Sequence, residues 1–179
     1  MDAHYIFTSE RLGFRNWKDS DLEKMILINS DKNVMKFFPF VPSTAQTKKF
    51  IQRMQKQFAR KGYCYFAVDL LETNLFIGFI GLSEQTYPAN FTPCTDIGWR
   101  LNKDHWNKGL ATEGAIACLK YAQQNLGLAK IYAVASLVNN NSIKVMEKAG
   151  MQFEEIFDHP NLIGDKRLKT CVLYCKKLN

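Results

Sequence analysis

Residues 96–113 read DIGWRLNKDHWNKGLATE and join a strand pattern to a helix pattern. The first six, Asp96 to Leu101, are typical of a strand, and Gly98 within them indicates a β-bulge or a close backbone approach. The clearest helical pattern of the chain then runs from Gly109 to Leu126, with small and apolar residues on one face and Gly127 as a C-cap. This stretch therefore predicts a strand, a loop and a helix that begins at a glycine.

The loop before that helix suits an anionic ligand. Gly109 lets the backbone approach a ligand closely, and the first-turn amides of a helix are unpaired and partly positive. A phosphate or pyrophosphate site is one interpretation, and an ordinary strand-to-helix turn is the other, because a single glycine is a weak signal. The sequence contains neither GxxxxGK[ST] nor GxGxxG, which excludes a Walker loop and a dinucleotide fingerprint.

The rest of the chain alternates strand and helix patterns. Further strands are predicted at 11–15, 63–68, 75–82, 130–138, 151–157 and 168–175. Further helices are predicted from Ser20, over 31–38, from Ser43 to Gly62 and over 142–149, with capping boxes at Ser20 and Ser43. The apolar run at 130–138 is typical of a strand buried on both faces. We expect an α/β (α+β) fold in one domain, residues 1–179 with a core of about 10–176, built on a mixed sheet of about seven strands with flanking helices.

Composition excludes several classes of protein. Hydrophobic residues make up 46% and charged residues 23% of 179, which argues against disorder, collagen and coiled coil. No segment approaches the roughly 20 apolar residues of a membrane span, and Met1 to His4 show no start of a signal peptide. The five cysteines are scattered and odd in number, which favours reduced thiols in the cytoplasm. The three histidines lie far apart in sequence, so we expect no metal site.

The net charge of +7 favours an anionic partner, such as nucleic acid, anionic lipid or a phosphorylated cofactor. A nucleic-acid-binding domain is disfavoured because no such motif occurs and the charge is dispersed. A basic stretch at 48–61 fits a solvated helix face better than a nucleic-acid site. A second polar feature, residues 139–142 (NNNS), follows the apolar run. It indicates either a helix cap or a ligand site at the carboxyl end of a strand.

Together these motifs resemble the Gcn5-related N-acetyltransferase (GNAT) superfamily, and most closely its RimJ/RimL-type branch. The resemblance covers about residues 10–176 and is specific for the superfamily but not for a substrate. It rests on the following segments: Arg11 to Arg15, Asp96 to Leu101, Trp106 to Glu113, Asn139-x-x-Ser142 and Val145 to Met151.

The resemblance implies acetyl-CoA as cofactor and no metal. The family's loop has the form Gln/Arg-x-x-Gly-x-Gly/Ala, in which Gly109 and Ala111 fill the small positions and Trp106 stands where Gln or Arg is usual. Asn107 replaces a frequent glycine. The strand 96–101 is expected to splay from the strand 130–138 in a V that takes the pantetheine arm. The implied cofactor contacts are Trp99, Leu101, Trp106, Asn107, Lys108, Gly109, Leu110, Ala111, Thr112, Asn139 and Ser142.

The resemblance also suggests catalytic residues. Attack on a thioester needs a neutral amine, so a base is required. Asp96 is the first candidate, with a solvated or salt-bridged strand residue as the alternative, and Glu84 is the second. Many relatives protonate the departing thiolate with a tyrosine at the position of Met146, and Ser142 is the substitute that this branch suggests. A backbone N–H near the expected bulge would hold the tetrahedral oxyanion.

The predicted function is therefore an acetyl-CoA-dependent N-acetyltransferase that acts by direct attack in a ternary complex. The acceptor is a primary amine, either the N-terminal α-amine of a protein or a small-molecule amine. The alternative is a non-catalytic acyl-CoA-binding or sensor protein on the same fold. Three phenylalanines, Phe37, Phe38 and Phe40, belong either to the acceptor pocket or to the core. We expect a cytoplasmic monomer or homodimer.

Overall fold

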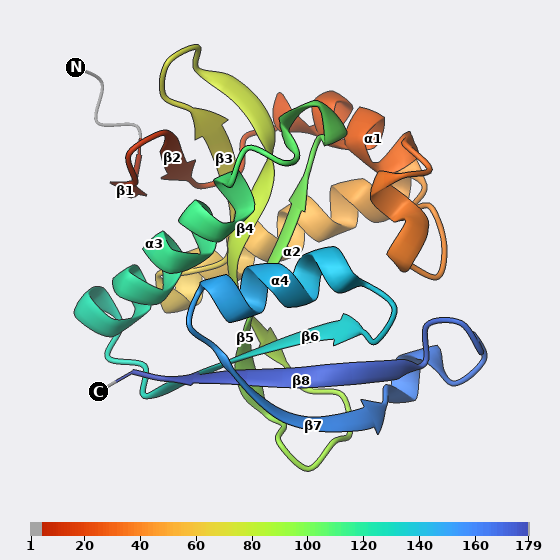
Figure 1. Ribbon diagram of the computed structural model, residues 1–179. Coiled ribbons are helices and arrows are strands. Elements are labelled where there is room, and N and C mark those ends of the chain that lie inside the picture. Colours follow the sequence, from red (N-terminus) through yellow and green to blue (C-terminus); the bar gives the residue numbers. More distant parts are fainter. Residues whose placement is uncertain (1–4, 179) are drawn as a thin grey trace.

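The computed structural model describes residues 5–178 and contains one open, mixed sheet of eight strands (Figure 1). The strands are β1 (Phe7–Thr8), β2 (Leu12–Arg15), β3 (Tyr65–Leu70), β4 (Leu75–Gln85), β5 (Cys94–Leu101), β6 (Lys130–Ser136), β7 (Gln152–Asp158) and β8 (Thr170–Lys177). The helices are α1 (Asp21–Ser30), α2 (Thr44–Lys61), α3 (Leu110–Asn125) and α4 (Asn140–Lys148), with short 3₁₀ helices η1 (Val34–Phe37), η2 (Lys103–His105) and η3 (Pro160–Leu162). The strand order is β1-β2-β3-β4-β5-β6-β8-β7. The predicted fold class is confirmed, with β1 as the strand that the sequence did not indicate.

Helices cover both faces of this sheet. In Figure 1, α3 and α4 lie in front of the strands and α2 lies behind them. The largest side chains that are fully buried include Phe14, Phe66, Ile80 and Leu82, which come from β2, β3 and β4. The core is therefore centred on the first half of the sheet, and it includes β4, the strand that pairs with β5. Among residues 5–178, no helix has both the length and the apolar character that a membrane crossing requires.

The helix starts show where local sequence signals succeed and fail. Ser43 forms the predicted capping box with Gln46, and α2 ends at Gly62, which has φ +75°. The capping box predicted at Ser20 is wrong, because Ser20 has helical dihedral angles and its side chain caps nothing. The carboxylate of Asp21 instead accepts the N–H of Lys18 at 2.8 Å. The helix expected at 31–38 shortens to η1 because the Asp31 side chain accepts the Asn33 N–H and forms a turn there.

The sheet opens between β5 and β6. β4 pairs with β5 continuously from Gly78–Leu101 to Gln85–Cys94, whereas β5 pairs with β6 only at Asp96–Tyr132. The predicted V is therefore confirmed, and Asp96 lies at its apex. The bulge expected at Gly98 is wrong, because the β4–β5 register shifts nowhere. A Cβ at Gly98 would lie 3.1 Å from the Tyr65 ring, so a side chain, and not the backbone that the sequence led us to expect, approaches this glycine closely.

Burial along β6 alternates, which corrects the expectation of a strand buried on both faces. Ile131, Ala133 and Ala135 are buried, whereas Tyr132 and Val134 are partly exposed. The reason is the V itself, because β6 has no neighbour along most of its β5 side and Val134 faces a cavity. The apolar run thus reflects the lining of that cavity as well as the core.

Candidate active site

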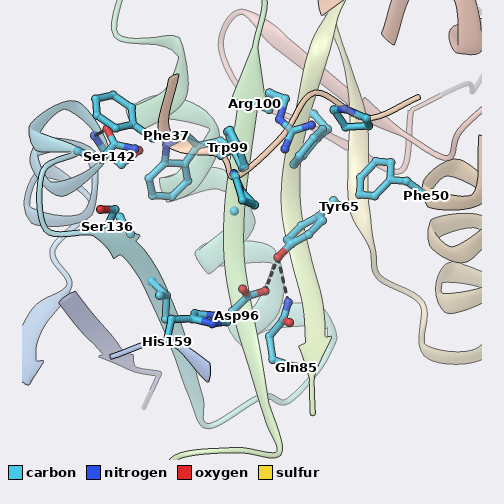
Figure 2. A pocket seen from close by; sticks show the side chains of 18 of the residues that line it. Phe37, Phe50, Tyr65, Gln85, Asp96, Trp99, Arg100, Ser136, Ser142 and His159 are labelled. Carbon is cyan, nitrogen blue, oxygen red and sulfur yellow. Dashed lines mark hydrogen bonds between the residues drawn. The ribbon is translucent and has the colours of Figure 1, made fainter. Parts of the chain in front are cut away.

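Two adjoining cavities lie along the V. The first, which we call the Asp96 cavity, has a volume of about 640 Å³ and extends from Asp96 towards α2 and η1 (Figure 2). The second, the loop cavity, has a volume of about 550 Å³ and is lined by the loop between β5 and α3. Residues that line both cavities are Phe37, Phe38, Trp99, Arg100, Asn139 and Ser142. A ligand in the loop cavity can therefore reach a second molecule in the Asp96 cavity.

The loop presents backbone amides to its cavity. Asn107 and Gly109 have φ values of +59° and +77°, in the left-handed region that glycine and asparagine tolerate best. Asparagine is therefore an adequate residue at position 107, where the resemblance led us to expect a glycine. Gly109 is the N-cap of α3, and as a glycine it offers no side chain to the first-turn amides. Those amides remain available for an anion.

Contacts from the turn between β1 and β2 hold this loop in place. The Arg11 Nε donates to Glu113 Oε2 at 2.7 Å, and the Arg11 guanidinium also donates to the Lys108 carbonyl at 3.0 Å. The Ser9 hydroxyl donates to Glu113 Oε1 at 2.7 Å. At the other end of the loop, the indole N–H of Trp106 donates to the Leu101 carbonyl at 2.9 Å. The loop and the first turn of α3 are thus fixed to the β1–β2 turn and to the end of β5.

The β5 backbone faces the V through alternate residues. The N–H of Asn102 donates to the Ile77 carbonyl on β4 at 2.8 Å. Because hydrogen-bonding direction alternates along an antiparallel strand, the N–H and C=O groups of Leu101, Trp99 and Ile97 point towards β6. The Leu101 carbonyl is occupied by Trp106, whereas the groups of Trp99 lie at the widening part of the V.

Asp96 lies within a hydrogen-bonded group that the sequence did not indicate. The Tyr65 hydroxyl donates to Asp96 Oδ1 at 2.6 Å, and Gln85 Nε2 donates to the same hydroxyl at 3.2 Å (Figure 2). Burial raises the pKa of Asp96 from 3.8 to about 6, against the opposing effect of these hydrogen bonds and of the Arg53 charge. Burial and the Asp96 charge likewise raise the pKa of Tyr65 well above its ordinary value. Asp96 is therefore ionised at neutral pH but close to its titration range.

Glu84 lies outside the lining of the Asp96 cavity. Its carboxylate forms ion pairs with Arg60 and, at 3.1 Å, with Lys61, both at the end of α2. It neighbours Ser83, which pairs with Asp96, so side chains of the two acidic residues point to opposite faces of the sheet. The structure thus separates the two candidate bases.

Ser142 lies at the start of α4 and lines both cavities. The helix is capped by Asn139, whose Oδ1 accepts the Ser142 N–H at 3.3 Å, and the Ser142 hydroxyl bonds to no other described residue. Met146 is one turn further along α4, buried, and lines the Asp96 cavity. Ser136, at the end of β6, also reaches this cavity, and its buried hydroxyl has no partner among residues 5–178. Nothing in the local sequence distinguished Ser136.

A family model described as an acetyltransferase (GNAT) domain matches residues 11–152. The chain belongs to the GNAT family of acetyltransferases. This acetyltransferase is 33% identical over 155 residues to a Bacillus subtilis protein described as the uncharacterized N-acetyltransferase YnaD, with 84% of each chain covered. The resemblance to the GNAT superfamily is therefore confirmed, and the protein is an acetyl-CoA-dependent acyltransferase.

Solved structures show the same fold. A GNAT-family acetyltransferase from Bacillus anthracis superposes with a TM-score of 0.78 at 29% identity and covers 95% of this chain and 96% of its own. The ribosomal L7/L12 α-N-protein acetyltransferase RimL, solved with coenzyme A, has a TM-score of 0.76 at 18% identity and covers 97% of each chain. Spermidine N-acetyltransferase from Vibrio cholerae, solved with CoA and spermine, has a TM-score of 0.71 at 17% identity, with 94% and 96% covered. The last two likenesses concern the fold alone.

Proposed function

We propose that this acetyltransferase transfers the acetyl group of acetyl-CoA to a primary amine by direct attack in a ternary complex, with Asp96 as the general base. One observation carries the proposal. A carboxylate with a pKa of about 6 lies in a cavity that adjoins a second cavity lined by helix-start amides. A base with a pKa slightly below neutral is ionised and can still accept a proton.

The residues of the loop cavity fit acetyl-CoA, which when bound supplies an acetyl thioester. Amides from Asn107 to Thr112, including those of Lys108, Leu110 and Ala111, would hold the pyrophosphate at the start of α3. Trp106 braces this loop through its indole bond. The carbonyl of Trp99 and the N–H of Leu101 would pair with the pantetheine arm.

Asp96 would remove the proton that keeps the acceptor inert. An α-amine has a pKa of about 8, so moving its proton to a carboxyl of pKa about 6 costs roughly 3 kcal/mol. The same transfer from a lysine-like amine of pKa about 10.4 costs roughly 6 kcal/mol. The Tyr65 hydroxyl fixes the orientation of the carboxylate. This difference favours α-amines and other weakly basic amines as acceptors.

Groups on β5 and α4 would complete the reaction. The N–H of Ile97 belongs to the single β5–β6 bridge at Asp96–Tyr132, whereas the N–H of Trp99 points into the open part of the V and would stabilise negative charge on the attacked carbonyl oxygen. The Ser142 hydroxyl, which is not needed for the helix cap, would donate a hydrogen bond to the departing thiolate. Asn139 lies beside it and holds the start of α4.

Thiol release tests the proposal directly. Purified protein is incubated with acetyl-CoA and a panel of small amines and N-terminal peptides, and free CoA thiol is measured. Turnover that depends on an amine supports the proposal. Calorimetric binding of CoA without turnover of any amine would instead favour a non-catalytic sensor protein.

We also propose that the protein works in a reducing compartment. All five cysteines are free, and four of them are buried. This supports a reducing compartment such as the cytoplasm. We expect the acetyltransferase to be a monomer or a homodimer, and sedimentation analysis would distinguish the two. Among residues 5–178, no group of three or more histidine, cysteine or acidic side chains is placed to hold a metal ion.

A further inference from the structure

The Asp96 cavity carries more positive than negative charge. Asp96 is the only carboxylate among the residues that line it, whereas Lys49, Arg53 and Arg100 contribute three cations. Lys49 and Arg53 are exposed on α2 and lie at the mouth. Arg100 lies inside, on β5 (Figure 2). A binding site for a polyamine would need the opposite balance, because like charges repel a polycation in a confined site.

Arg100 forms no ion pair with any of residues 5–178, and neutral groups hold it in position. Its guanidinium lies 4.0 Å from the centre of the Phe38 ring and 5.5 Å from that of Phe79, and it donates to Asn29 Oδ1 at 2.7 Å. Its Nε is shielded from solvent and has no hydrogen-bond partner among residues 5–178. The aromatic rings and the amide orient the guanidinium but leave its charge uncompensated.

An uncompensated guanidinium in such a place is costly. Burial lowers the pKa of Arg100 to about 10, so the group is still charged at neutral pH. Arg100 is only partly exposed, and a charge that its neighbours shield from water in this way is normally paired within the protein. The planar fork of a guanidinium also matches carboxylate and phosphate oxygens, to which it donates two parallel hydrogen bonds. A bound molecule can therefore supply the negative charge that Arg100 lacks.

The strand register places Arg100 on the same face as the candidate base. Asp96, Gly98 and Arg100 alternate with Ile97 and Trp99, so the first three share one face of β5. Four residues of strand span about 13 Å between the Cα atoms of Asp96 and Arg100. An amine beside Asp96 and an anion beside Arg100 are therefore separated by several bonds, as in a dipeptide. In a free α-amino acid the amine and the carboxylate are too close together for one to reach Asp96 while the other reaches Arg100.

We propose that the acceptor of this acetyltransferase carries an oxyanion, a carboxylate or a phosphate, which Arg100 binds while the acceptor amine lies against Asp96. The inference rests on the proposed function. The rings of Phe38, Phe50 and Phe79 form the walls between the two ends, so an apolar body fits between amine and oxyanion. Arg100 is thus a specificity-determining residue for the acceptor.

A binding experiment tests this proposal without any turnover. Protein saturated with CoA is titrated in a calorimeter with 3-phenylpropionate, with its uncharged amide 3-phenylpropanamide, and with phenyl phosphate. The acid should bind at least about tenfold more tightly than the amide, as expected for a hydrogen bond between charged groups. The phenyl phosphate arm shows which oxyanion is preferred. Equal affinity for all three compounds would overturn the proposal, and this comparison needs only the unmodified protein.

Variants then assign the preference to Arg100. Arg100→Gln should lower affinity for the acid about tenfold to a hundredfold and leave affinity for the amide unchanged. Lys56→Gln is the matched control, because Lys56 is an exposed cation of α2 that does not line the cavity. An Arg100→Gln protein that keeps the preference for the acid would overturn the assignment. So would one whose only change is weaker CoA binding, because Arg100 would then belong to the cofactor site.

Turnover separates this inference from the function on which it rests. The dipeptide Ala-Phe, Ala-Phe amide and spermidine are compared as acceptors by thiol release. The dipeptide should have the highest kcat/KM, at least about tenfold above its amide. Equal kcat/KM for the dipeptide and its amide overturns the inference and leaves the acetyltransferase activity in place. A lack of turnover with every amine, with CoA bound, overturns the proposed function, while the calorimetric comparison still decides the charge preference.

Discussion

Asp96→Asn removes one negative charge from the Asp96 cavity and preserves the shape of the side chain. The amide oxygen of asparagine can still accept the Tyr65 hydroxyl that Asp96 accepts at 2.6 Å. The variant therefore tests the charge rather than the packing. Loss of a general base typically costs about a hundredfold in rate, and we expect a loss of about that size in kcat/KM at pH 7.

The pKa of about 6 sets the shape of the pH profile. In the unmodified enzyme, kcat/KM should rise about tenfold per pH unit up to about pH 6 and then level until the acceptor amine itself titrates. In Asp96→Asn this inflection should disappear, and the deficit should shrink at high pH, where the amine is already neutral. The assay is thiol release over pH 5 to 9 with one amine, with CoA affinity measured in parallel.

Asp96→Asn should raise the stability of the fold although it lowers activity. The pKa of Asp96 in the folded protein lies above its ordinary value of 3.8, so the ionised carboxylate destabilises the fold above about pH 6. Two pKa units correspond to an upper limit of about 3 kcal/mol. Asp96→Asn should therefore unfold at higher denaturant concentration than the unmodified protein at pH 8, and this gain should vanish as the pH falls from 6 to below 4. A pH-independent loss of activity together with lowered stability would refute the reasoning and make Asp96 a structural residue.

The remaining predictions concern the loop and the two other candidate residues. Gly109→Val should raise the Kd for CoA in calorimetry and lower Tm modestly, because a φ of +77° strains a β-branched residue and the strain shifts the backbone amides. Unchanged CoA affinity would show that the phosphate site lies elsewhere. Ser142→Ala should lower kcat and leave CoA affinity and Tm nearly unchanged, whereas Asn139→Ala should cost about 1 kcal/mol of stability in denaturant titration, because Asn139 is the cap. A fall in stability alone for Ser142→Ala contradicts its proposed role. Glu84→Gln should keep the pH profile of the unmodified enzyme, and loss of its inflection would make Glu84 the base instead.

Local signals in the sequence predicted those features that neighbouring residues decide. Hydrogen bonds and dihedral angles within one turn decide three such features: the capping box at Ser43, the end of α2 at Gly62 and the glycine at the start of α3. The motif at 106–113 and the resemblance it carries therefore identified the family and the loop. The same local rule failed at Ser20, because Asp21 is drawn into a buried ion pair with Arg15 at 2.7 Å, and that contact competes with the cap.

Only the tertiary structure decided the chemistry of the cavity. Asp96 acquires its raised pKa from burial beside Tyr65, which is 31 residues away and on another strand. Arg100 is oriented by Asn29, 71 residues away, and by the ring of Phe38. Such effects arise from the exclusion of water by segments that meet only in the folded chain, so no periodicity or spacing encodes them. The sequence by itself thus determined the family and the cofactor loop, whereas the packing of β3, β5, α1 and η1 decided the charge state of the base and the charge of the acceptor site.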